Sequence, residues 1–407
     1  MIVNNIKIVK VKRLLFIIIL LSSYNLLVCA SSVDKLKLHN LLRQVDFYLT
    51  SGNFEKAADL RDQALVLFKK IGAENDESTF SGLHMISHTY SERKMYNDAI
   101  KTESVLVEVF PLAIPNNKKD YALYLNDLAF YSLQAGDFER GMQSVNKAIK
   151  CLENTDNDEA LAIIYIRTAE LLSESDSTKL DTAILYQATA VDIYKKIYGN
   201  ESNKTLDEVQ YLVKYYEKAN KFQKACSLAK EIWDIKYNHE KESSENILYY
   251  KNYVRLSDLC NDTLTVINNI HPLDSLTKQI YGEFSDEYIE SLLENAEYLQ
   301  HYRLYSQSGD NVIRMLHVAD SLHNNSLKPY YDYAYHFATN LQLLHQHRIS
   351  ATILKTIIDR SNDFTFDNKE LVIASKIAYA HSLSRIGELS TSLLILNQIE
   401  EDAIKLY

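Results

Sequence analysis

The residues that first suggest chemistry are His84 and His88, which stand four positions apart in a stretch expected to be helical. Such spacing places two imidazoles on one helix face, as zinc ligands require. The intervening residues are Met85–Ser87, so the glutamate of an HExxH motif is absent, and no third ligand follows at a helpful spacing. His345 and His347 fall at an expected turn and are a weaker pair. The pattern therefore favours polar lining of a groove over a metal site.

Other catalytic signatures are missing from the sequence. The glycines never form a GxGxxG or GxxxxGK run, the serines lack a G-x-S-x-G context, and no cysteine lies in a nucleophile motif. Three cysteines follow residue 30, Cys151, Cys226 and Cys260, an odd number at irregular spacing. We expect these cysteines to be buried as small hydrophobic side chains, and a disulfide between Cys226 and Cys260 is the alternative. The sequence predicts no catalytic residue, no cofactor and no metal.

The elements that would position these residues are helices. The chain has 407 residues, 46% of them hydrophobic, but only 9 Gly and 4 Pro. A sandwich or barrel needs turn residues every 8–12 positions, roughly, and a disordered chain has fewer apolar residues. The composition therefore predicts an all-α chain whose helices are joined by short links.

Residues 1–30 resemble a secretory signal. An apolar stretch from Leu14 to Val28 follows four basic residues, and Val28-Cys29-Ala30 offers small residues for cleavage after Ala30. Ser22–Asn25 interrupt the apolar run, which argues against a retained membrane anchor. Lipidation of Cys29 is the less favoured alternative. The expected location is outside the cytoplasm, periplasmic or secreted, with a lipid-anchored form through Cys29 as the minority reading.

Charge narrows the class of partner. Cleavage would remove four basic and no acidic residues, leaving 40 Lys and Arg against 54 Asp and Glu, a formal charge of −14. Such a balance works against binding to nucleic acid or to an anionic membrane. The sequence therefore predicts no nucleic-acid partner and no membrane insertion after signal removal.

A 42-residue period runs through the rest of the chain. Its first column holds large residues, with Phe54, Tyr96 and Phe138 as the clearest examples. Nine units fit if one single-residue shift is placed between the sixth and seventh. A small residue follows three positions later in eight units, and an apolar residue seven positions after that in eight units. The exceptions are Ile267 and Asp274 of the sixth unit. Because these spacings share one helical face, each unit is expected to be two antiparallel helices that must stack on their neighbours.

The pattern resembles a tetratricopeptide repeat (TPR), and its residues in the third unit are Leu128-Ala129-x-Tyr131-x4-Gly136-Asp137-Phe138-x2-Gly141-x6-Ala148. The 42-residue length is similar to the long repeats of kinesin light chains and of many bacterial repeat proteins. The resemblance covers residues 36–407 and is strongest in units one to five. It implies a right-handed superhelical solenoid whose concave face binds peptides or proteins, without chemistry of its own.

Two places depart from the pattern. Ser173–Lys179 replace the tight turn of the fourth unit, so a lengthened loop is expected. In the sixth unit Pro272 falls inside the second helix, where proline costs about 3 kcal/mol. The expected layout is a signal at 1–30, repeats one to five and the start of repeat six at 31–254, an irregular segment at 255–275 that bends or docks a partner, and weaker repeats seven to nine at 276–407.

The resemblance also implies which residues face the groove, at thirteen, ten and six positions before the turn column. Those positions hold mixed polar and aromatic residues, and the Lys/Asn clamp that grips a peptide's terminal carboxylate in some relatives is not reproduced. The groove residues are His84, His88, Asn126, Phe130, Tyr165, Thr168, Gln210, Lys214, Tyr249, Asn252, Glu297, Tyr335 and Thr339.

Tyrosine is abundant, with 29 residues in three main clusters around Tyr211, Tyr249 and Tyr330. We expect most of them to fill wide spaces between helices, and some to line the groove as rigid anchors.

The leading functional hypothesis is an exported TPR scaffold that binds a protein or peptide in its concave groove, without catalysis. One alternative is the sensing or docking arm of a larger signalling or caspase-like peptidase protein, because Glu400–Tyr407 end a helix without a polar cap. A second is a surface glycan-binding lipoprotein that uses Cys29 and the tyrosines. The sequence specifies neither the partner nor the oligomeric state.

Overall fold

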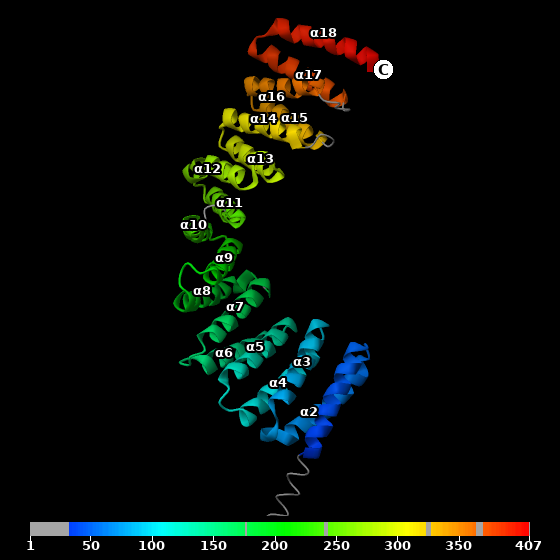
Figure 1. Cartoon of the computed structure of the whole chain (residues 1–407), viewed down its shortest axis with the longest axis vertical. Helices are drawn as coiled ribbons and strands as arrows, with labels where there is room; N and C mark the ends of the chain where they lie inside the picture. The colour runs from blue at the N-terminus through cyan, green and yellow to red at the C-terminus, as the bar shows by residue number, and fades with distance from the viewer. Residues whose placement is uncertain (1–31, 176, 240–242, 323–326, 364–368, 407) are drawn as a thin grey trace, which may run out of the picture. The chain divides into compact units, whose positions relative to one another are not determined.

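The computed structural model describes residues 32–406 apart from 176, 240–242, 323–326 and 364–368 (Figure 1). The expected signal at 1–30 lies outside the described residues. Every regular element in the described part is a helix, which confirms the all-α prediction. None of the described helices combines the length and the apolar character needed to cross a membrane. The chain forms two compact units, one ending at Ala219 and the other beginning at Asn220.

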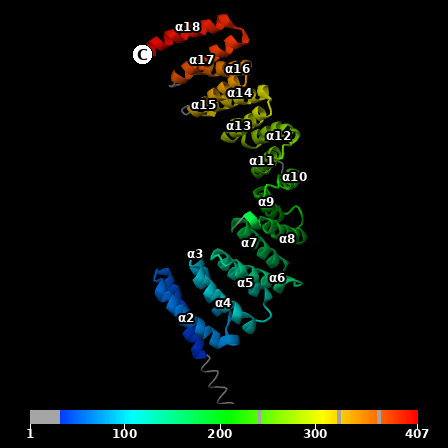
Figure 2. The same ribbon diagram turned by 180° about the vertical axis from the view of Figure 1, so that it is seen from behind.

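Unit 1 is a stack of antiparallel helix pairs in chain order. Its helices are residues 32–50, α2 (Phe54–Ile71), α3 (Glu77–Glu92), α4 (Tyr96–Ala113), α5 (Lys118–Gln134), α6 (Phe138–Leu152), α7 (Asp158–Ser175), α8 (Leu180–Tyr198) and α9 (Asn203–Lys218), with short 3-10 turns η1 (Gly72–Glu74) and η2 (Ser177–Lys179). The first helices of the repeats, α3, α5 and α7, lie in one layer, and α2, α4, α6 and α8 lie in the other (Figures 1 and 2).

Unit 2 continues the same alternation. Its helices are α10 (Phe222–His239), α11 (Ser244–Leu259), α12 (Thr263–Tyr281), α13 (Asp286–His301), α14 (Tyr305–Leu322), α15 (Lys328–Leu343), α16 (His347–Asp363), α17 (Lys369–Ile386) and α18 (Leu389–Leu406). Four predicted pairs lie in each unit. The fifth is divided, with α9 closing unit 1 and α10 opening unit 2. The boundary between the two units thus falls at 219/220, within the fifth predicted repeat.

In every repeat except the fourth, the turn between paired helices is built on a left-handed residue two positions before the second helix. Glycine holds this place three times, with φ of 81° at Gly52, 85° at Gly136 and 95° at Gly387. At Gly136 the neighbouring amides close the turn, because Gly136 N–H donates to Leu133 O (3.1 Å) and Asp137 N–H to Ser132 O (2.9 Å). Other repeats use non-glycine residues in the same conformation, including Lys94 and Asn261.

The small-residue column marks where the two helices of a pair cross. Ser308 Oγ donates to the carbonyl of Ala296 (2.6 Å), and Ser392 Oγ donates to that of Ala380 (2.7 Å), each 12 residues earlier on the first helix. Gly141 occupies the same place in the third repeat, and a Cβ there would lie 3.3 Å from Ala129 O. Close crossing therefore explains why a small side chain recurs at this position.

The sixth repeat corrects one detail of the sequence register. Its left-handed turn residue is Asn261 and α12 begins at Thr263, so the single-residue shift falls between the fifth and sixth repeats. With that shift the buried columns are Val266 and Leu273, 0% and 2% exposed. Leu273 therefore replaces Asp274 in the apolar column, whereas Val266 is still larger than the residues at the crossing position of the other repeats. Asp274 instead accepts hydrogen bonds from Ser291 (3.0 Å) and Asn295 (2.6 Å).

Segment 255–275, expected to be irregular, is helical on both sides of an ordinary turn. It contains the end of α11 and the first part of α12, and Pro272 lies inside α12. Proline leaves the carbonyl four residues earlier without its helical donor, and that residue, Asn268, is on the exposed side where water can replace the donor. Proline also occurs inside α4, at Pro111. A proline in the second helix is therefore compatible with the repeat.

The fourth repeat has the lengthened loop that the sequence predicted. Ala169 is buried where Ala129 is buried one repeat earlier, 40 residues apart and not 42. Two extra residues therefore separate Ala169 from the start of α8, and η2 (Ser177–Lys179) lies in this connection. This insertion shifts the register of α7 by two positions relative to the 42-residue grid.

Candidate functional site

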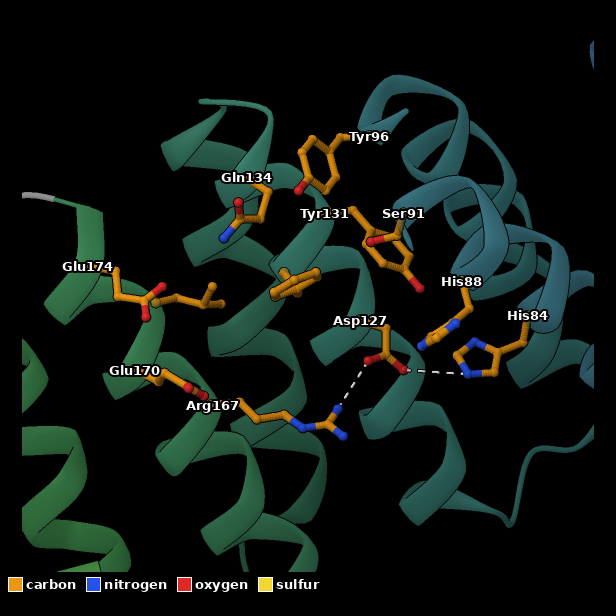
Figure 3. Close-up of a pocket in the computed structure, with 12 residues that line it drawn as sticks. His84, His88, Ser91, Tyr96, Asp127, Tyr131, Gln134, Arg167, Glu170 and Glu174 are labelled. Carbon is orange, nitrogen blue, oxygen red and sulfur yellow. Dashed lines mark hydrogen bonds and ion pairs between the residues drawn. The ribbon is translucent and has the colours of Figure 1, made fainter. Parts of the chain in front are cut away.

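A pocket of about 670 Å³ opens on the first helices of three successive repeats in unit 1 (Figure 3). Residues three, four and seven apart share a helix face, so each helix contributes about two turns of its inner surface. The lining comprises His84, His88 and Ser91 of α3, Tyr96 of α4, Asp127, Phe130, Tyr131 and Gln134 of α5, and Arg167, Glu170, Leu171 and Glu174 of α7.

A chain of ion pairs crosses the lower wall of this pocket. His84 Nδ1 lies 3.4 Å from Glu103 Oε1, and His84 Nε2 lies 3.7 Å from Asp127 Oδ2. Arg167 donates to the other oxygen of Asp127 at 3.1 Å. Figure 3 shows Asp127 between the two basic side chains. These ion pairs link α3, α4, α5 and α7, so they fix the three lining helices relative to one another.

Glu103 is the buried anchor of this chain. Its side chain is fully buried on α4 and accepts a hydrogen bond from Ser87 Oγ. Burial raises the pKa of Glu103 and also that of Asp127. Burial alone would lower the pKa of His84, but the adjacent Glu103 and Asp127 carboxylates outweigh it and raise that pKa.

Both ring nitrogens of His84 thus face carboxylate oxygens. The imidazolium form carries an N–H on both nitrogens and can therefore pair with both carboxylates, and the raised pKa of His84 favours that form. His84, Glu103 and Asp127 also each place one possible metal-ligand atom within 4.8 Å of the others. A divalent ion that bound there would have to displace the proton of His84. His88 faces Glu92 instead, at 3.5 Å.

The α7 side of the pocket is acidic. Glu170 and Glu174 are exposed and one helical turn apart, and no ion pair joins either one to a cation in the part of the chain that the structure describes. Glu208 of α9 adds a third carboxylate, whose pKa is raised by burial and further by the charges of Asp207 and Glu170. It accepts a hydrogen bond from Gln187 (2.8 Å).

The remaining surface of the pocket is apolar. Phe130 and Leu171 are half-buried lining residues, and Tyr131 is only 2% exposed. Burial raises the pKa of Tyr131, so its hydroxyl stays protonated. That hydroxyl faces Ser87 and has no hydrogen-bond partner among the described residues. The pocket therefore combines a polar wall, an apolar floor and an acidic rim.

Three of the sequence-predicted groove residues line this pocket: His84, His88 and Phe130. Three others are buried, Asn126 at 3%, Thr168 at 1% and Tyr249 at 8% exposure. The Thr168 hydroxyl donates a hydrogen bond to the carbonyl of Ile164 (2.7 Å), four residues earlier, as threonine side chains within helices often do. A buried side chain cannot contact a ligand on the inner face. The residue that faces the pocket or the solvent is the neighbour of each predicted one in the sequence.

The other predicted residues lie outside the pocket. Tyr165 packs beside Tyr186, with ring centroids 5.5 Å apart, and Lys214 of α9 lies over the Tyr211 ring. Gln210 is half-buried on the same helix. In unit 2, Asn252 accepts a hydrogen bond from Arg255 (2.7 Å) and Glu297 accepts one from Tyr333 (3.3 Å). Tyr335 and Thr339 of α15 are half-buried.

The corrected turn of the sixth repeat moves its groove positions back by one residue. Ten and thirteen positions before Asn261 are Lys251 and Leu248, in place of Asn252 and Tyr249. Leu248 is 64% exposed, whereas Tyr249 is buried. Sequence reasoning also missed Asp127, Arg167, Glu170 and Glu174. For the three α7 residues the available signal was the two-residue insertion before α8, which makes Glu170 the equivalent of Phe130; the sequence pattern gave no signal for Asp127.

Comparisons with known proteins concern the fold. No family model and no curated protein matches the sequence. A putative kinesin light chain with nearly identical TPR-like repeats from Podospora anserina is 15% identical, with a TM-score of 0.38, over 50% of this chain and 97% of that one. The C-terminal part of a TPR repeat-containing protein from Cytophaga hutchinsonii is 15% identical, with a TM-score of 0.43, over 71% and 98%. Aspartyl phosphate phosphatase F from Bacillus subtilis is 11% identical, with a TM-score of 0.37, over 89% and 93%.

Antiparallel helix pairs recur along both units, and most of them have a tight turn and a small buried residue where the helices cross. These are the features on which the resemblance to tetratricopeptide repeats was based. The chain is an all-α, TPR-like repeat protein.

Proposed function

We propose that the chain is a non-catalytic repeat scaffold that binds a segment of another protein, or a peptide, in the pocket between α3, α5 and α7. The observation that carries this proposal is that three successive first helices contribute side chains to one hollow. A volume of about 670 Å³ is that of a cavity accommodating a few side chains.

Preorganisation supports the same proposal. The His84–Asp127–Arg167 chain joins the three lining helices, and Glu103 anchors it from the second layer. A surface fixed before binding loses less conformational entropy when a ligand arrives. The exposed groups around it, including His88 and Glu174, supply hydrogen-bonding capacity at the rim.

Site-specific photocrosslinking in the full chain tests this assignment. A benzophenone amino acid at position 88 would stand at the pocket rim, and one at position 66 would stand on α2, where Val66 is 72% exposed. We expect a protein adduct from position 88 that is absent from position 66. Equal adducts at both positions, or an adduct only at position 66, would contradict binding at the pocket.

Export is part of the proposal and is supported by the basic, apolar and small-residue order of residues 1–30. Mass spectrometry of the mature N-terminus tests it directly. A chain that begins at Ser31 supports cleavage and release. A lipidated Cys29 would instead support anchoring at the surface, and an intact N-terminus would contradict processing altogether.

A further inference from the structure

The acidic rim of the pocket is only partly neutralised by the described residues. Glu170 and Glu174 stand at i and i+4 on α7, a spacing at which like charges repel each other. Arg167 of the same helix pairs with Asp127 at 3.1 Å. Lys218 of α9 donates to the uncharged carbonyl of Ser173 at 3.4 Å, so its positive charge stays beside this rim and offsets part of the negative charge there.

A neighbouring carboxylate adds to the same local charge. Glu208 lies close enough to Glu170 for that charge to contribute to its raised pKa. Its hydrogen-bond donor is the neutral amide of Gln187, which leaves the negative charge in place. The three carboxylates Glu170, Glu174 and Glu208 exceed the single positive charge of Lys218, so the α7–α9 side of the pocket attracts a further cation.

Apolar surface lies directly beside this charge. Phe130 and Leu171 line the pocket between the acidic rim and the α5 wall, and the buried Tyr131 hydroxyl still lacks a partner. A long side chain with an apolar stem and a cationic head satisfies both parts at once. Lysine and arginine have this construction, and both place their stems on apolar surface while the charged head stays polar.

We propose that the pocket takes a lysine or arginine side chain from the bound protein segment. Its stem lies on Phe130 and Leu171, and its cationic head lies between Glu170 and Glu174. This inference depends on the proposed function and names the chemistry of the ligand. Charge complementarity between a cation and two unpaired carboxylates is what selects it, and the same charge disfavours acidic segments.

Peptide selection with a matched control tests the inference. Random 12-residue peptides displayed on phage are selected on the wild-type chain, on Glu170→Gln/Glu174→Gln, and on Glu55→Gln/Asp59→Asn. The last variant loses two exposed acidic groups with the same i, i+4 spacing from α2, outside the pocket. A selected peptide is then synthesised with a fluorescein label, together with an analogue in which its lysine or arginine is replaced by methionine.

We expect wild type and the α2 control to enrich peptides with a lysine or arginine next to an apolar residue. The methionine analogue should bind about tenfold more weakly, as expected for one charge-assisted hydrogen bond. In Glu170→Gln/Glu174→Gln that difference should vanish, and raising the salt from 50 mM to 500 mM should weaken only the basic peptide.

Two other outcomes separate the inference from the proposed function. Enrichment of peptides without a basic residue, or an unchanged methionine effect in the double variant, would overturn the inference and leave peptide binding intact. Failure of the wild-type chain to enrich any peptide over the bare support would contradict both. Circular dichroism of each variant establishes that it is folded before selection.

Discussion

His84→Ala should destabilise α3 and α5 far more than its surface position suggests. The His84 side chain is 31% exposed, but it is the main counter-charge of Glu103, which is 0% exposed. Removing one partner of a buried ion pair costs about 3–5 kcal/mol, because the other charge stays buried without compensation. Water entering the space of the lost ring, and protonation of Glu103, reduce that cost. We expect about 2–3 kcal/mol.

A second substitution isolates the ion-pair contribution. Glu103→Gln keeps the size of the side chain and its contact with Ser87 but removes the charge. In that background His84→Ala should cost only about 1 kcal/mol, so the two substitutions should be coupled by about 1–2 kcal/mol. His88→Ala is the matched control, since His88 lies on the same helix with its side chain 61% exposed. Exposed substitutions of this kind usually change stability by less than about 0.5 kcal/mol.

Amide hydrogen exchange of the full chain, read by mass spectrometry, is the suitable assay. A repeat array opens locally, so a single global unfolding curve would mix the contributions of many repeats. Peptides from α3 and α5 should exchange faster in His84→Ala. The fluorescence of Trp233, the sole tryptophan of the chain, reports on unit 2 and should keep its unfolding midpoint. Equal exchange in His84→Ala and His88→Ala, or full additivity with Glu103→Gln, would refute the reasoning.

Three further outcomes are expected. Folding raises the pKa of His84, so protonated His84 stabilises the folded state fully below pH 6.5, and this contribution is lost as pH rises through the folded-state pKa. Amide exchange of α3, corrected for its intrinsic rate, should therefore be slower at pH 6 than at pH 9. His84→Gln should reduce that difference. Asp76→Ala removes the acceptor of the Thr79 amide (3.0 Å) at the start of α3 and should cost about 1 kcal/mol, seen as faster amide exchange in α3 peptides. Since the pKa of Asp76 is lowered to about 2, this contribution should fade as pH falls below 3.8. Gly136→Ala should speed exchange in α5 and α6 because the φ of Gly136 is 85°, at a cost of about 1–2 kcal/mol, whereas Lys94→Gly, at φ 61°, should slow exchange in α3 and α4 slightly.

The repeat architecture could be predicted from the sequence because each column has one dominant physical requirement. A close helix crossing excludes large side chains, so Ala57, Ala99 and Ser350 recur at equivalent positions and are all 0% exposed. A left-handed turn favours glycine, but asparagine also adopts it, as Asn220 does. That tolerance explains why a one-residue shift in the sixth repeat was misplaced: Leu264 resembled a column residue, although the structure leaves it 74% exposed.

The pocket was only partly predictable because it depends on where the repeats differ. A strict 42-residue grid places Ala169 opposite Asp127, but two residues turn a helix by about 200°, and Ala169 is buried. The two-residue insertion before α8 brings Arg167 against Asp127 instead, and it aligns Glu170 with Phe130 on the inner face. The insertion itself lies in a loop outside the pocket. The repeated columns therefore determine the stacking, while a local change of register determines which side chains, and which charge, the pocket presents to a ligand.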